Sequence, residues 1–149
     1  MRRTSLADFH CSVARTADVI AEWWTPLIVR DAFYGRTRFE EFQQSLGLAR
    51  NVLAARLGRL VEAGIMERRP YQEHPPRHEY VLTEKGRDLF PIIAAMLAWG
   101  DKWTAGEAGP PLLLVHEPCG QAGALRPTCS QCGEPLGLDN IRPTPGPGA

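Results

Sequence analysis

The stretch RFEEFQQSLGLARNVLAARLGRLVEAG, residues 38–64, decides the fold. Its first part, 38–46, repeats apolar residues at steps of three and four, which is the spacing of one helix face. Its second part, 48–63, carries a stripe of leucines with the same period. Gly47 and Gly64 follow these segments, as glycine often follows the C-terminus of a helix. Two helices joined by so short a turn form a helix-turn-helix pattern.

The flanking sequence predicts further helices and a β-ribbon. Residues 12–20 and 25–34 are predicted helices, the second with Thr25 as a hydroxyl N-cap before Pro26. Residues 65–71 and 77–82 are predicted strands, and the two prolines within 72–76 place that segment in a loop at the ribbon tip. Thr83 caps a predicted last helix, 84–105. The expected fold class is therefore mainly α with a small β-ribbon (α+β).

Composition limits the class of protein. The 149 residues fit one domain with a small appendage, and 44% hydrophobic and 23% charged residues are typical of a globular protein. Seventeen basic and seventeen acidic residues exclude a strongly basic nucleic-acid coat. The longest apolar stretch, 90–100, is too short to span a bilayer, which needs ~20 residues. We therefore expect a cytoplasmic protein without membrane contact.

The outer side of segment 48–63 has the composition of a surface that enters the DNA major groove. Arg50 and Asn51 offer hydrogen bonds to base edges near the start, next to Ala49. Small residues, Ala54 and Ala55, would let the backbone lie close to the duplex. The alternative is that these side chains form an ordinary solvated surface with no role in DNA binding.

Other arginines are expected to contact phosphates. Arg36 and Arg38 precede the first helix of the pair, and Arg56 and Arg59 flank the second. Three more give the ribbon a basic edge: Arg68, Arg69 and Arg77. Residues 35–87 hold ten basic and seven acidic side chains, a modest excess that dimerisation would double.

Several motifs carry a family resemblance. In chain order they are Cys11-x-Val13-Ala14-Arg15-Thr16, Trp24-Thr25, Gly35-x-x-Arg38-Phe39, Leu53-x-x-Arg56-Leu57, Gly64-Ile65, Pro75-Pro76-Arg77-x-x-Tyr80-x-Leu82-Thr83-x-x-Gly86 and Trp99-Gly100. Over residues 9–104 the chain resembles the HxlR family of winged helix-turn-helix transcription regulators, which are related to the MarR group. The resemblance implies a homodimer on double-stranded, pseudo-palindromic promoter DNA, with recognition helix 49–63 and wing 65–82.

Two positions depart from the family pattern. Ala21-Glu22-Trp23 stands where the family usually has Gly-Gly-Lys, so any contact of that lysine is absent. Ala49 stands where a serine commonly opens the recognition helix, and the lost side-chain cap costs ~1 kcal/mol. Both departures leave the operator sequence undetermined.

The last predicted helix has a surface suited to a partner. Apolar residues follow steps of three and four along it: Leu89, Ile92, Met96, Trp99 and Trp103. Two tryptophans are a large apolar surface for a monomer to expose. We expect a homodimer through helix 84–105 and the N-terminal helix, although a monomer burying the whole helix itself is the alternative.

Cys11 lies apart from the other three cysteines. A lone cysteine is most often a small buried hydrophobic residue. The functional alternative is a thiol that senses an oxidant or electrophilic effector, which the family resemblance also implies for this position.

The C-terminal part differs in composition from the rest. Residues 105–149 hold eight of the fourteen glycines and eight of the thirteen prolines, and 143–149 is an expected flexible tail. Within 112–140, two ligand-x-x-ligand-Gly turns supply four metal ligands: His116, Cys119, Cys129 and Cys132. Three sulfurs and an imidazole predict a structural Zn²⁺ site, a zinc-knuckle-like appendage. Free thiols and a Cys129–Cys132 redox pair are the alternatives, and Cys11 or water would replace His116 if it does not bind.

No catalytic motif accompanies these residues. Zinc deaminases place a glutamate two residues after the ligand histidine, whereas Glu117 directly follows His116. We therefore expect no enzyme. The alternative to a DNA-binding regulator is a zinc-stabilised protein-interaction module on a winged-helix scaffold without DNA contact.

Overall fold

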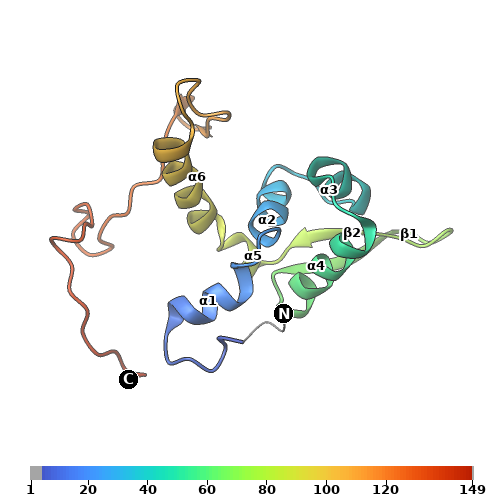
Figure 1. The fold of residues 1–149 in the computed structure, drawn as a ribbon, viewed down its shortest axis with the longest axis horizontal. Helices are drawn as coiled ribbons and strands as arrows, with labels where there is room; N and C mark the ends of the chain where they lie inside the picture. Colours follow the sequence, from blue (N-terminus) through green and yellow to red (C-terminus); the bar gives the residue numbers. More distant parts are fainter. Residues whose placement is uncertain (1–4, 149) are drawn as a thin grey trace. The chain divides into compact units, whose positions relative to one another are not determined.

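The computed structural model describes residues 5–148. The chain divides into two compact units, Met1–Ile93 and Ala94–Ala149. The elements of the first unit are α1 (Ser12–Ile20), α2 (Thr25–Phe33), α3 (Phe39–Leu46), α4 (Arg50–Glu62), β1 (Met66–Gln72), β2 (Arg77–Leu82) and α5 (Glu84–Arg87) (Figure 1). Helix α6 (Phe90–Thr104) crosses the boundary, and the second unit adds β3 (Val115–His116) and β4 (Gln121–Ala122). Among the described residues no helix is both long and apolar enough to cross a membrane.

The core of the first unit lies between α2, α3, α4 and the base of the ribbon. The predicted leucine stripe of α4 is buried, with Leu53 and Leu57 fully inaccessible. They pack with Ile28 and Val29 of α2 and Phe42 of α3. Burial of these side chains turns the opposite side of α4 toward solvent, which is the arrangement that the sequence predicts.

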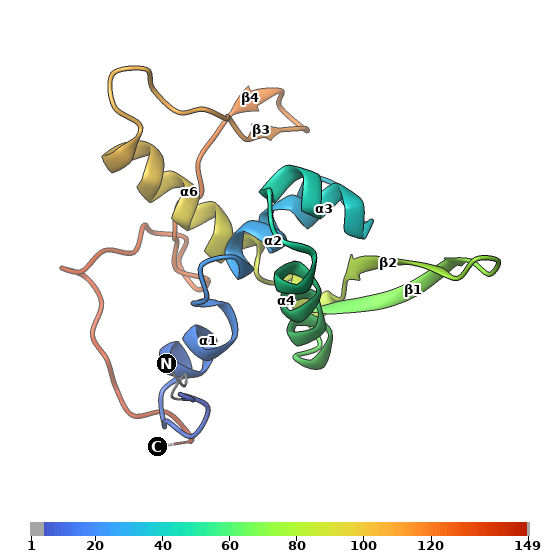
Figure 2. The ribbon, with the colours of Figure 1, turned by 45° about the vertical axis from the view of Figure 1, so that its right-hand side comes forward.

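The ribbon forms the predicted wing. Strands β1 and β2 pair antiparallel with Met66 opposite Leu82, and the pairing becomes irregular between Pro70 and Gln72. Residues 73–76 form the connecting turn, as the two prolines require. Figures 1 and 2 both show the ribbon extending away from the helices of its unit.

The start of α3 is joined to the wing and capped by its own sequence. The Tyr80 amide donates to the Thr37 carbonyl at 2.7 Å. The Glu41 carboxylate accepts from the amides of Thr37 and Arg38, both at 2.9 Å. These bonds, the one from Arg38 first, lower the pKa of Glu41 below its ordinary value. The stabilisation is therefore present at neutral pH and is lost as the pH falls through that lowered pKa.

The predicted single helix 84–105 is wrong, because the structure contains two helices there. Helix α5 ends at Arg87, and α6 begins at Phe90. Pro91 has no amide hydrogen to donate to the carbonyl of Arg87, so one continuous helix would lose that bond. Thr83 caps α5 as predicted, and its side chain accepts from the Gly86 amide at 3.1 Å.

The predicted cap of the second helix is also wrong. Trp24 occupies the N-cap position of α2, and Thr25 is the buried first residue of the helix. Its own amide donates to the Glu22 carbonyl at 3.0 Å. Pro26 lies in the first helical turn, as predicted.

The second unit has no apolar core of its own beyond its helix. From residue 105 to residue 148 every described side chain is at least partly exposed. Strands β3 and β4 have only two residues each and pair antiparallel. The unit begins within α6 at Ala94, whereas the sequence prediction placed the end of the first domain at residue 104.

Candidate nucleic-acid interface

The exposed side of α4 carries the residues predicted to contact bases. Arg50, Asn51, Ala54 and Ala55 are all exposed. Ala49 is the N-cap and offers no side-chain acceptor, so the first amides of α4 have no side-chain cap. Such uncapped amides, at the positive end of the helix dipole, are suited to bind a phosphate. The exposed side of α4 therefore combines small side chains, base-competent donors and amides without a side-chain cap.

Arg50 is held in place by an aromatic ring. Its guanidinium carbon lies 4.7 Å from the centroid of the Phe39 ring, and Phe39 is itself partly buried against the core. A cation over a ring face is attracted by the ring quadrupole. Phe39 thus limits the positions that the Arg50 side chain can adopt, a role that neither its place in the helical period nor its place in the motif Gly35-x-x-Arg38-Phe39 indicated.

The wing supplies three exposed arginines. Arg68 and Arg69 lie on β1, and Arg77 starts β2. Arg68 Nη2 is 3.1 Å from His78 Nδ1, and Arg69 forms an ion pair with Glu67. Because that pair is exposed, it costs little to break, and Arg69 stays accessible to a phosphate.

The two arginines before α3 have different surroundings. Arg38 is exposed, and its guanidinium carbon lies 4.9 Å from the centroid of the Tyr71 ring on the wing. Arg36 Nη1 is 3.4 Å from Asp31 Oδ1, and Asp31 is fully buried in α2. Arg38 is thus placed beside the wing, whereas Arg36 partly neutralises a buried carboxylate.

Arg56 and Arg59 meet an acidic partner within the chain. Both form ion pairs with Glu22, which lies between α1 and α2. Arg56 is the less exposed of the two, and its Nε has no partner within the described part of the chain. Glu22 belongs to the segment 21–23 that departs from the family pattern, but that departure indicated only a missing lysine and not these ion pairs. A phosphate would have to compete with Glu22 for either arginine.

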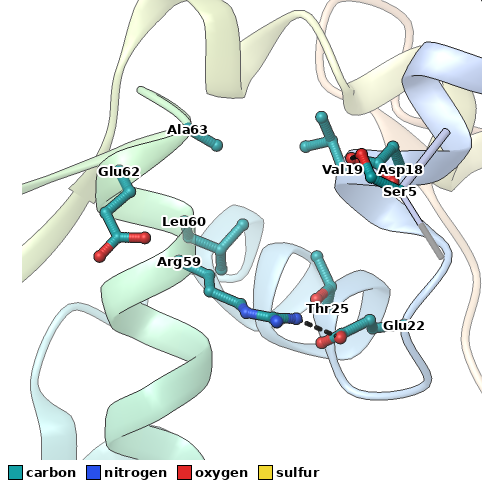
Figure 3. A pocket seen from close by; sticks show the side chains of 9 residues that line it. All are labelled: Ser5, Asp18, Val19, Glu22, Thr25, Arg59, Leu60, Glu62 and Ala63. Carbon is teal, nitrogen blue, oxygen red and sulfur yellow. Dashed lines mark hydrogen bonds and ion pairs between the residues drawn. The ribbon is translucent and has the colours of Figure 1, made fainter. Parts of the chain in front are cut away.

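A cavity of about 400 Å³ lies beside this ion pair. Figure 3 shows its lining residues, which come from the N-terminal segment, α1, the start of α2 and the end of α4. The Glu22 carboxylate and the Arg59 guanidinium meet across one side of it. The cavity connects the surroundings of α1 with the basic flank of α4.

Cys11 is exposed at the N-cap of α1, which corrects the interpretation of a buried hydrophobic residue. Helix α1 has no buried residue, and Phe9 and Val13 at its start are exposed.

The apolar residues that were predicted to face a partner from the last helix fall into two groups. Leu89 and Ile92 pack on the core of the first unit, which the sequence prediction did not anticipate. Met96, Trp99 and Trp103 are exposed by 51%, 64% and 65%. Helical spacing therefore identified the apolar residues, but it could not distinguish those that the single chain buries from those that it leaves exposed.

The four predicted metal ligands form two separate pairs. His116 Nδ1 lies 3.3 Å from Cys119 Sγ. Hydrogen bonds from the Cys132 amide, the Gln131 amide and the Cys132 side chain lower the pKa of the Cys129 thiol. Within residues 5–148 no three metal-competent side chains come together. The structure thus brings together each pair but not all four ligands.

An exposed, uncapped helix over a buried leucine stripe, followed by a basic ribbon, defines a winged-helix DNA-binding protein. Residues 19–108 match the family described as HxlR-like helix-turn-helix. The chain belongs to this family of helix-turn-helix transcriptional regulators.

Individual relatives agree with this assignment. The HTH-type transcriptional regulator Rv3095 of Mycobacterium tuberculosis is 45% identical over 137 residues, which cover 92% of this chain and 87% of the relative. The crystal structure of PA1607, described as a transcription factor, superposes with a TM-score of 0.86 at 45% identity, covering 95% of this chain and 99% of that one. The reduced form of the redox regulator HypR gives a TM-score of 0.59 at 35% identity, covering 62% and 92%.

Proposed function

We propose that the protein is a sequence-specific transcriptional regulator that binds pseudo-palindromic promoter DNA as a homodimer. The observation that carries the proposal is the exposed start of α4, where Arg50, Asn51 and free backbone amides adjoin two alanines. Arg50 and Asn51 are assigned to base edges. The wing arginines and Arg38 are assigned to phosphates.

The homodimer is supported by the apolar surface that a single chain leaves exposed. In the second unit the exposed apolar residues of α6 are Met96, Trp99 and Trp103. In the first unit, taken by itself, Val13 of α1 and the preceding Phe9 are exposed. A monomer gains nothing from presenting tryptophans to water, whereas aromatic side chains are enriched in protein interfaces. Two-fold symmetry would place two copies of α4 on two half-sites.

The alternative of a protein-interaction module without DNA contact is not favoured. The relatives are named as transcriptional regulators, and the basic side of α4 is solvent-exposed rather than covered.

Replacing Arg50 by alanine is expected to relax base preference at one position of each half-site. Loss of a bidentate base contact costs about 1–3 kcal/mol, roughly 5- to 150-fold in affinity for the preferred sequence only. The measurement is a titration of fluorescent operator fragments, first selected from genomic DNA, and of the same fragments with single base changes.

The matched variant is Arg69→Ala on the wing. Loss of one phosphate contact should weaken binding to all sequences alike and reduce the salt dependence of binding by about one ion. If both variants lost discrimination between bases to the same extent, the division between a reading helix and a phosphate-binding wing would be refuted.

We also propose that Cys11 senses thiol-reactive oxidants or electrophiles. The thiol is exposed at the N-cap of α1, and HypR, a structural relative, is a redox regulator. Helix α1 borders the cavity in which Glu22 meets Arg59, so a displacement of α1 would act on the basic flank of α4. The effector signal would thus pass from α1 to the DNA-binding surface.

Treatment with diamide in the presence of a small thiol is expected to change operator affinity through Cys11. Cys11 Sγ and the small thiol would form a mixed disulfide, while two protons and two electrons pass to the diazene. The Cys11→Ser variant should keep its affinity after treatment, whereas Cys132→Ser should respond like the unaltered protein. Operator titration measures the affinity, and mass spectrometry identifies the modified cysteine. If treatment changed the operator affinity of Cys11→Ser as much as that of the unaltered protein, Cys11 would be excluded as the sensor.

A further inference from the structure

The two cysteine-containing turns of the second unit have the same backbone structure. In the first, the amides of Cys119 and Gly120 donate to the His116 carbonyl at 3.1 and 2.8 Å. In the second, the Gly133 amide donates to the Cys129 carbonyl at 2.8 Å. Gly120 and Gly133 have φ values of 67° and 78°, a left-handed conformation that favours glycine. The repeated glycine in the sequence therefore has a structural cause.

Each turn lies at the end of a short antiparallel arm. Strands β3 and β4 flank the first turn, with His116 paired to Gln121. Around the second turn Thr128 forms a bridge with Pro135, and the Cys129 amide donates to the Glu134 carbonyl at 2.8 Å. The two arms fix the ends of each turn, so its two ligand side chains leave the same end of the hairpin.

The first ligand pair has nearly the spacing that a tetrahedral zinc site requires. Zn²⁺ binds sulfur at ~2.3 Å and nitrogen at ~2.0–2.1 Å, which places two ligands of a tetrahedron about 3.5–3.7 Å apart. His116 Nδ1 and Cys119 Sγ lie 3.3 Å apart, close to this ligand–ligand distance. Cys129 and Cys132 have the same two-residue separation in the sequence, and their turn is closed by the Gly133 amide, which donates to the Cys129 carbonyl at 2.8 Å.

The described residues 105–148 that carry the two turns contain no buried core. No side chain there is buried, although folding of so small a segment normally needs a core, a disulfide or a metal. Gly120 and β4 belong to the first hairpin and Thr128 to the second, so residues 123–127 form the connection between them. Five extended residues span up to ~17 Å, which is long enough to let the two hairpins approach.

We infer that the two turns close on a single Zn²⁺ ion, with His116, Cys119, Cys129 and Cys132 as its four ligands. On binding, the three cysteines release their protons to solvent and coordinate as thiolates. Four protein ligands leave no open position for water, so the ion is structural. It would join the two hairpins into one folded appendage. This inference does not depend on DNA binding.

The test measures metal content and coordination in the full-length protein. Elemental analysis of protein purified with zinc present should give one zinc per chain. Replacement by Co²⁺ should give the visible absorption of a tetrahedral thiolate complex, and zinc should then displace it. A zinc content near zero, or an absorption spectrum typical of octahedral Co²⁺, would overturn the inference.

Substitutions identify the ligands. Cys129→Ser and Cys119→Ser should each weaken zinc binding at least 100-fold in a chelator competition. His116→Ala should weaken it and alter the Co²⁺ spectrum. Cys11→Ser is the matched control, and it should retain one tightly bound zinc. Full zinc retention in Cys129→Ser or His116→Ala, or loss of zinc in Cys11→Ser, would contradict the assigned ligand set.

Proteolysis provides a readout that is independent of the metal measurement. Without zinc the segment 105–148 should be cut readily after Leu125 by chymotrypsin, because no side chain in this segment is buried. With zinc bound the same site should be protected in the unaltered protein and in Cys11→Ser, but not in Cys129→Ser. Equal cleavage with and without zinc in the unaltered protein would refute a folded zinc-bound appendage.

Discussion

The double substitution of Trp99 and Trp103 by alanine is expected to convert the proposed homodimer to a monomer and to lower affinity for a two-half-site operator at least 100-fold. Tryptophan is enriched among the interface residues whose replacement by alanine costs about 2 kcal/mol or more. Once the dimer is lost, the second half-site no longer benefits from the high effective concentration of a linked subunit. Light scattering on a sizing column and operator titration measure the two effects.

This substitution should leave the monomer folded, because both side chains are already about two-thirds exposed in a single chain. The thermal midpoint at low protein concentration is therefore expected to stay within a few degrees. Leu138→Ala, at a side chain that is 96% exposed, is the control for loss of an apolar surface residue elsewhere. A double variant that remains dimeric and binds the operator normally would exclude α6 from the interface.

The helix-turn-helix unit could be predicted from sequence because its signals are local. The apolar period of α4, the glycines after α3 and α4 and the two prolines of the wing each act within a few residues. The structure confirms the exposed side of α4, since a stripe that is buried on one side leaves the other side in solvent.

Two errors were local, the missed helix break before Pro91 and the misplaced cap of α2. The others concern interactions between segments distant in sequence. The pairing of Arg56 and Arg59 with Glu22 joins α4 to a residue more than thirty positions earlier. No helical period reveals such a contact. Nor could spacing separate Ile92 from Trp99, because the distinction depends on which residues of α6 pack on the core.

For the metal ligands, too, the sequence predicts local contacts but not contacts between distant segments. The two-residue spacing within each turn predicts a local pair, and the structure forms both pairs. Whether the pairs meet depends on an ion that the sequence does not encode and on the connection between residues 119 and 129.

Gly86→Ala is expected to destabilise the winged-helix domain by about 3 kcal/mol, even though alanine favours helices over glycine. A Cβ atom at Gly86 would lie 2.1 Å from the Ile65 carbonyl oxygen and 3.0 Å from Leu82 Cδ2. That carbonyl also accepts from the Thr83 amide at 3.0 Å, so it cannot move without breaking the joint between the wing and α5. Thermal unfolding should show a decrease of about 15 °C in Tm.

Gly58→Ala is the matched control, because Gly58 also lies inside a helix but a Cβ there would meet no atom within 4 Å. This variant should gain up to ~1 kcal/mol from the lower backbone entropy of its unfolded state. The opposite signs follow from one difference, the presence or absence of a backbone carbonyl beside the new methyl group. If Gly86→Ala also raised the Tm, the close packing of α5 against the base of the wing would be disproved, and with it the fixed wing that places Arg68 and Arg69.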